Sequence, residues 1–95
     1  MIEKLIEKLK IEAFLTVVEH EEGEDCDMWV LTDGKNKAVI RYIAPYFYIE
    51  MHNVAGKSYK LGLAREEDGL DRVVDYISKE FDRLYLELEK RRDSE

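Results

Sequence analysis

The chain has 95 residues, enough for one small domain with a single modest core. Its formal net charge is −7, and an acidic chain repels phosphate groups, so binding to nucleic acid or to an anionic membrane is disfavoured. No apolar run is long enough for a signal peptide or a membrane span, and the single cysteine cannot form an internal disulfide. We therefore expect one cytoplasmic domain over residues 1–95.

The first predicted element is a short amphipathic helix over residues 2–11. Apolar residues recur there at helical spacing, and glutamate and lysine fill most of the other positions. The apolar residues are Ile2, Leu5, Ile6 and Leu9.

Five segments after this helix are rich in β-branched and aromatic residues, which predicts strands. Short links join them, with an Asp-Gly turn signal in residues 33–36, so an antiparallel meander is the simplest topology. Pro45 has no backbone donor and marks a bulge, an edge or a break. The predicted strands are residues 13–20, 27–32, 37–44, 46–52 and 57–64.

A long C-terminal helix is the clearest pattern in the chain. From Leu70 to Leu88, apolar residues follow one another at alternating steps of four and three. Asp68 is a good N-cap, so the helix should run from about residue 69 to 90, with residues 91–95 as a frayed tail. Each helix has one apolar stripe, and both most simply cover the same face of the sheet. The predicted fold is therefore a two-layer α+β domain of element order α-β-β-β-β-β-α.

The C-terminal helix should overhang the sheet. A helix of about 22 residues is about 33 Å long, whereas a strand of six residues is about 20 Å long. Large apolar side chains at the overhanging end then need cover. Either the N-terminal helix or a loop covers them, or they form a homodimer contact between helices. These side chains include Leu84, Leu86 and Leu88.

The second face of the sheet is the other candidate surface. If Phe47, Ile49 and Met51 face the helices, the residues that alternate with them in 46–52 face away. Tyrosine with arginine is typical of an interaction surface, although cross-strand packing on a solvated sheet explains the same pattern. The candidate interaction residues on this face are Arg41, Tyr46, Tyr48, His52 and Tyr59.

Residues 19–27, with the sequence EHEEGEDCD, form either a metal site or a turn. Six carboxylates, one histidine and one cysteine lie in these nine residues. A firm zinc motif has paired cysteine or histidine ligands, and the spacing of a calcium-binding loop is absent. A solvated acidic turn is the favoured interpretation, and a weak cation site or an acidic docking patch is the alternative. The candidate metal ligands are Glu19, His20, Glu22 and Cys26.

No catalytic motif stands out, and we expect neither an enzyme nor a cofactor. The serines, Ser58, Ser78 and Ser94, show no oriented base in the sequence, as nucleophilic catalysis requires. No glycine-rich loop precedes a helix to bind phosphate. Basic residues that share a face with tyrosines would suit RNA bases, but the signature and strand order of RNA-binding sheets are absent.

The whole chain resembles, in size, composition and element order, small acidic α+β proteins of hyperthermophilic archaea that are classed as domains of unknown function. Charged residues form 39% of the chain and glutamine is absent, which is typical of proteins from hyperthermophiles. A looser likeness is to bacterial secretion chaperones, which are small, acidic and dimeric but place helices among their strands. Neither resemblance supplies a functional motif.

The sequence thus predicts a non-enzymatic interaction module that acts as a homodimer, with an unidentified protein as a further partner. The alternative is a protein that binds a small molecule or a cation through residues 19–27 or through the outward side chains of the sheet.

Overall fold

Two helices and a five-stranded antiparallel sheet make up the structure, a computed structural model that describes residues 2–65 and 69–93. The elements are α1 (Ile2–Glu12), β1 (Thr16–Glu22), β2 (Asp27–Thr32), β3 (Lys37–Ile43), β4 (Tyr46–His52), β5 (Ser58–Arg65) and α2 (Leu70–Asp93). The strands lie side by side in chain order, which confirms the predicted meander. Pro45 lies in the two-residue turn between β3 and β4, after a cis peptide bond, and so marks a break as predicted.

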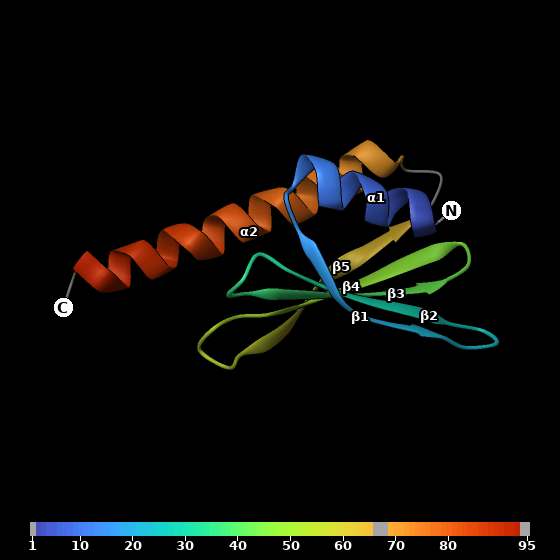
Figure 1. Ribbon diagram of the computed structural model, residues 1–95, viewed down its shortest axis with the longest axis horizontal. Coiled ribbons are helices and arrows are strands. Elements are labelled where there is room, and N and C mark those ends of the chain that lie inside the picture. The colour runs from blue at the N-terminus through green and yellow to red at the C-terminus, as the bar shows by residue number, and fades with distance from the viewer. Residues whose placement is uncertain (1, 66–68, 94–95) are drawn as a thin grey trace.

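The core lies between the helices and one face of the sheet. Phe47, Ile49 and Met51 alternate along β4 and are at most 2% exposed. Both helices lie on this side of the sheet (Figure 1), and their apolar stripes complete the same buried cluster. The predicted two-layer arrangement is therefore confirmed. The helices contribute Ile2, Leu5, Ile6 and Leu9 from α1, and Val73, Val74, Ile77, Phe81 and Leu84 from α2.

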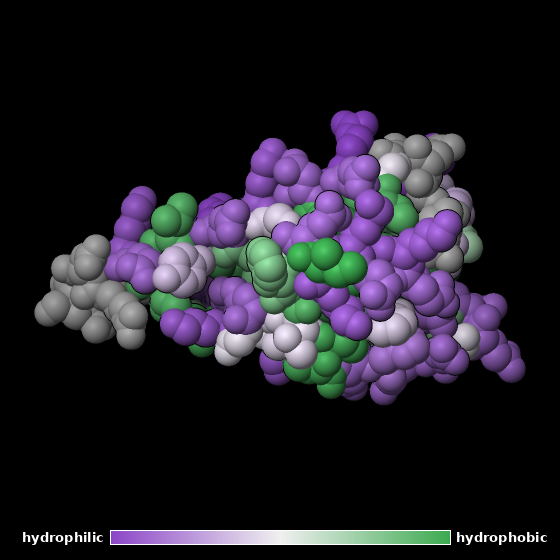
Figure 2. All heavy atoms as spheres, turned by 45° about the horizontal axis from the view of Figure 1, so that its top comes forward, coloured by the Kyte–Doolittle hydropathy of each residue, from purple (hydrophilic) through white to green (hydrophobic). Residues whose placement is uncertain are grey.

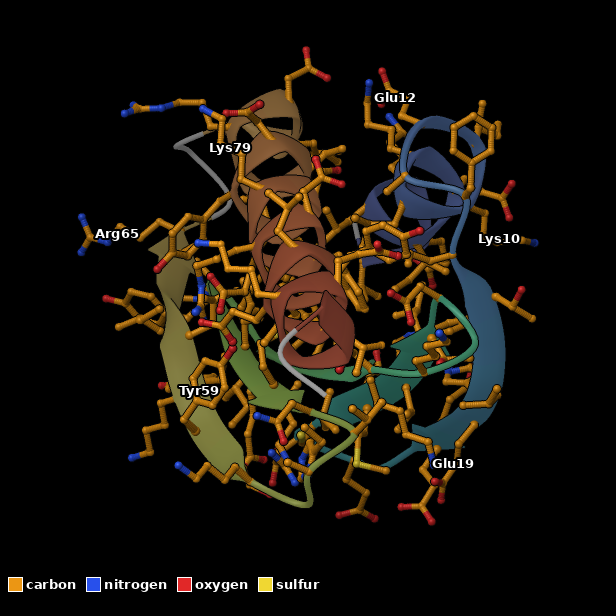
Figure 3. The ribbon with its side chains drawn as sticks, turned by 90° about the vertical axis from the view of Figure 1, so that its left-hand side faces the viewer. Lys10, Glu12, Glu19, Tyr59, Arg65 and Lys79 are labelled. Atoms are coloured by element: carbon orange, nitrogen blue, oxygen red, sulfur yellow. The ribbon has the colours of Figure 1, made fainter. Side chains whose placement is uncertain are left out.

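The sheet is curled around the helices. Figure 3 looks along α2 and shows β1 and β5 rising on either side of it. The pairing has an irregularity in β1 between Val17 and Glu19, and another in β5, where Leu61 is an extra residue opposite Ile49 and Glu50. Such bulges bend a strand and increase its twist. The side of the sheet that points away from the helices is here called the outer face.

The first strand begins at residue 16, three residues later than predicted, because the preceding residues complete the end of α1. The backbone N–H groups of Ala13 and Leu15 both donate to the carbonyl oxygen of Leu9. Phe14 between them has a φ of 57°, a left-handed conformation that usually belongs to glycine at a helix end. Its side chain is 84% exposed. The apolar run that predicts a strand therefore starts in a helix terminus.

The β2–β3 and β4–β5 turns are joined by a buried side chain. Asn36 is 2% exposed, and its Oδ1 accepts a hydrogen bond from the backbone N–H of Val54 at 3.1 Å. Within its own turn, Asp33 Oδ1 accepts hydrogen bonds from the N–H groups of Lys35 and Asn36, at 2.9 and 2.8 Å. The predicted Asp-Gly turn thus also connects two hairpins.

Helix α2 runs past the strands, as Figure 1 shows. The molecule is 47 Å long, against 23 and 21 Å in its other two dimensions. The helix continues to Asp93, so part of the predicted tail is helical. Residues 94–95 and the predicted N-cap Asp68 lie outside the described residues. Within the described residues, neither helix has an apolar stretch that would span a bilayer.

Candidate interaction surface

The outer face carries four of the five residues that the sequence places there. The register sets Arg41 opposite Tyr48, while Tyr46 and His52 alternate with the buried residues of β4. Their predicted orientation is therefore correct. The outer-face side chains of β3, β4 and β5 are Lys37, Val39, Arg41, Ile43, Tyr46, Tyr48, Glu50, His52, Ser58, Lys60, Leu63 and Arg65.

Large apolar and aromatic side chains are exposed on this face. Ile43 is 42% exposed, Tyr48 41% and Leu63 59%. Tyr46 meets Tyr48 edge to face, with 6.5 Å between the ring centres. Arg65 Nη2 donates to the hydroxyl of Tyr46 at 3.1 Å, and its guanidinium carbon lies 5.4 Å from the centre of that ring. These contacts hold the aromatic side chains in fixed positions at the surface.

Val30 and Val39 form the floor of a shallow hollow in the outer face. They oppose each other in the register and are only 7% and 8% exposed, although they point away from the helices. Longer side chains around them, including Glu19 and Lys37, line the hollow. The hollow therefore has an apolar floor and a charged rim, an arrangement that protein interfaces share.

Polar side chains on β3, β4 and β5 contact one another. Glu50 Oε2 accepts a hydrogen bond from Arg41 Nη1 at 3.2 Å and lies 3.6 Å from His52 Nε2. His52 Nδ1 lies 2.7 Å from Ser58 Oγ. The sequence did not reveal that Ser58 contacts a histidine, because the two residues meet only through strand pairing.

Serine, histidine and glutamate thus occur in the order of a nucleophilic triad, but their geometry does not support that chemistry. The distance of 3.6 Å between His52 and Glu50 exceeds a hydrogen bond, and Arg41 already engages the same carboxylate oxygen. Ser58 is exposed, whereas acyl transfer relies on an enclosed site that stabilises the developing oxyanion. These groups instead form a polar edge to the outer face.

Tyr59 was predicted on the outer face, and this prediction is wrong. The register pairs it with Met51 on the inner side, where its hydroxyl donates to the Glu80 carboxylate (Figure 3). Arg83 Nη2 donates to the same hydroxyl oxygen at 3.0 Å. The bulge at Leu61 breaks the alternation of β5. Tyr59 therefore faces the helices, whereas Leu63 and Arg65, at the odd-numbered positions after the bulge, face away.

This contact predicts a loss of stability at high pH. Burial and the hydrogen bond to Glu80 raise the pKa of Tyr59 to about 12, from a usual value of 10.0. The folded protein holds the phenol proton more tightly than the unfolded chain, so the free energy of unfolding should fall as the pH rises from about 10 to 12. Urea unfolding of the wild type and Tyr59→Phe at pH 9 and pH 11 should show a smaller fall in the variant. An equal fall in both proteins would contradict this assignment.

The hairpin turns, rather than α1, cover the beginning of the overhanging part of α2, and its last turns extend beyond them (Figure 1). Leu84 is 4% exposed and lies beside Asn36 and Val54, so it belongs to the core and is not available to a partner. Leu88 is half-buried at the same place. Only Leu86, among the three predicted leucines, is well exposed, at 60%.

The four candidate metal ligands are divided between different places. Glu19 lies on the outer face and points away from the helices (Figure 3), whereas His20 stacks on Trp29 on the inner side, with ring centres 3.5 Å apart. Glu22 lies beside His20, at 3.8 Å, and the carbonyl of Cys26 accepts a hydrogen bond across the turn. In residues 2–65 and 69–93, no group of three or more His, Cys, Asp or Glu side chains is placed to hold a metal ion.

Comparison with known proteins supplies no relative. No family model, curated protein or solved structure matches the chain. Its function must therefore be inferred from its own residues.

Charge is divided between the first hairpin, which is acidic, and strands β3 to β5, which are basic. Residues 16–32 contain six carboxylates and no lysine or arginine, whereas residues 37–65 contain five lysine or arginine residues and one carboxylate, Glu50. On the outer face, Glu19 lies at the β1 edge and Lys60 at the β5 edge. The net charge of the whole chain does not show this division. Counting charges segment by segment along the sequence would have shown it. Figure 2 shows hydrophilic side chains over much of the helix side.

Proposed function

We propose that the protein is a non-enzymatic interaction module that binds another protein surface through the outer face of its sheet and acts as a homodimer. The apolar side chains on this uncovered face carry the proposal. An antiparallel sheet with one face in water normally alternates apolar residues inside with polar residues outside. Here the outer side carries Val30 and Val39, which are nearly buried, and also the exposed side chains of Ile43, Tyr48 and Leu63.

Tyrosine and arginine on this face strengthen the proposal. Both residue types are enriched where proteins bind one another, and a rigid tyrosine loses little conformational freedom on binding. Tyr46 and Tyr48 are held by each other and by Arg65, and Arg41 is held by Glu50. The surface is thus prearranged for a partner. A cytoplasmic location is part of the proposal, supported by the single cysteine.

A matched pair of double variants tests which surface is used. Tyr48 and Leu63 oppose each other on the outer face and are 41% and 59% exposed, and Tyr85 and Leu86 on α2 are 52% and 60% exposed. Tyr48→Ser with Leu63→Ser should weaken dimerisation at least about tenfold, because each apolar contact contributes on the order of 1 kcal/mol or more. Tyr85→Ser with Leu86→Ser should leave the dimerisation constant unchanged. Sedimentation velocity over a concentration series measures both.

The reverse result, in which the α2 pair alone dissociates the dimer, would assign the interface to the helix. A wild type that stays monomeric at about 100 µM would overturn the homodimer.

A further inference from the structure

We infer that two copies of the chain bind outer face to outer face in one arrangement, with the acidic β1 edge of each copy over the basic β5 edge of the other. This inference rests on the proposed function, because it specifies how two copies meet on the same surface.

One row of cross-strand neighbours carries the argument. The row runs across the outer face from Glu19 on β1, through Val30, Val39 and Glu50, to Lys60 on β5. Its two ends have opposite charge. Among residues 2–65 and 69–93, the side chains of Glu19 and Lys60 form neither an ion pair nor a hydrogen bond. Both charges are therefore available to a partner.

Symmetry then selects one arrangement. Two copies that stack face to face are related by a twofold axis in the plane between them. An axis parallel to β3 places β1 of one copy on the same side as β5 of the other, so that the charges of a Glu19 and a Lys60 attract each other twice across the curled edges of the dimer. An axis across the strands places β1 over β1 and brings the acidic 16–32 segments together, each with six carboxylates. Juxtaposed like charges are unfavourable, so the axis parallel to β3 is favoured.

The size of the face suits a weak dimer. Five strands at a spacing of about 4.8 Å, and seven residues at about 3.3 Å each, give a face of about 24 by 23 Å. Two flat faces of this size would bury roughly 1,100 Å² together. Because the sheet curls around the helices, the outer face is convex and the buried area is smaller, at or below the limit of about 1,000 Å² for specific interfaces. Dimerisation should therefore depend on its charge pairs and weaken with salt.

Single charge reversals test the arrangement. Glu19→Lys and Lys60→Glu each create like-charge contacts, and each substitution acts twice in a twofold dimer. Each variant alone should dimerise about tenfold or more weakly than the wild type at about 50 mM salt. An equimolar mixture should form a heterodimer of wild-type affinity, because both contacts are then complementary again. Native mass spectrometry resolves the heterodimer by its mass, and sedimentation gives the affinities.

The heterodimer also controls for folding, since a misfolded variant would not restore binding. Far-UV circular dichroism of each variant should match the wild type, because both substituted side chains are exposed.

Other outcomes separate this inference from the proposed function. If the serine variant at Tyr48 and Leu63 dissociates the dimer while neither charge reversal weakens it, the outer face is the interface but the arrangement is wrong. A homodimer of Lys60→Glu as tight as the wild type, without preference for the mixture, would point to the other axis and overturn the inference. A monomeric wild type that binds labelled oligoglutamate or a single-stranded oligonucleotide would overturn it too, and would assign the basic strands to that ligand.

Discussion

Replacing Phe47 by alanine should lower the free energy of unfolding by about 3–5 kcal/mol, because the substitution leaves a cavity in the centre of the core. The side chain of Phe47 is 0% exposed and faces both helices. Tyr48→Ala, one residue further along β4, should lower the same free energy by less than about 1 kcal/mol, since Tyr48 is 41% exposed on the opposite face. Urea unfolding followed by circular dichroism measures both changes.

The contrast between these neighbours decides whether the outer face is free to bind. A loss for Tyr48→Ala as large as that for Phe47→Ala would mean that Tyr48 maintains the fold rather than a binding surface. In that case, weaker dimerisation of an outer-face variant could come from loss of the fold and would not show that a contact in the interface was lost.

Asn36→Ala should have the second-largest effect, a loss of about 1–3 kcal/mol. The substitution removes the acceptor for the N–H of Val54 and leaves that donor without its partner beside buried Leu84. The two hairpin turns would lose their connection, and the cover over the overhanging part of α2 would loosen. Chemical unfolding gives the change in free energy.

Lys35→Ala is the matched control in the same turn. Lys35 is exposed, and the turn uses its backbone N–H rather than its side chain. Its substitution should change the free energy of unfolding by no more than about 0.5 kcal/mol. If both substitutions changed the free energy of unfolding equally, the hydrogen bond between Asn36 and Val54 would not contribute to stability.

The sequence predicts the secondary structure well where periodicity is strong. Residues 27–32 and 46–52 coincide with β2 and β4, because alternation and turn residues mark both ends of each strand. The apolar stripe of α2 gives its length to within a few residues. The start of β1 is misplaced because Phe14, an aromatic residue, occupies a left-handed position that the sequence would assign to glycine.

Positions of single side chains are harder to predict because they depend on register. The bulge at Leu61 reverses the face of Tyr59, and its local signal is the adjacent Gly62, since a glycine inside a strand often marks a bulge. The sequence predicts that Leu84 is exposed, because its burial depends on the turns that contain Asn36 and Val54 and lie beside it in the fold. The contact between His52 and Ser58 likewise requires the pairing of β4 with β5. The orientation of Arg41 and Tyr48 is predictable, since alternation alone determines it.

The division of charge between the acidic 16–32 hairpin and the basic strands β3 to β5 gives this sheet an electric dipole. A dipole experiences a torque in the field of an approaching molecule, so the protein turns before any contact forms. A cationic surface would meet the 16–32 hairpin first, and an anionic surface would meet β5 first. Salt screens charges over about 10 Å. Within that distance, the sign of the nearest charges, rather than the net charge of −7, therefore determines which side of the protein faces an approaching molecule.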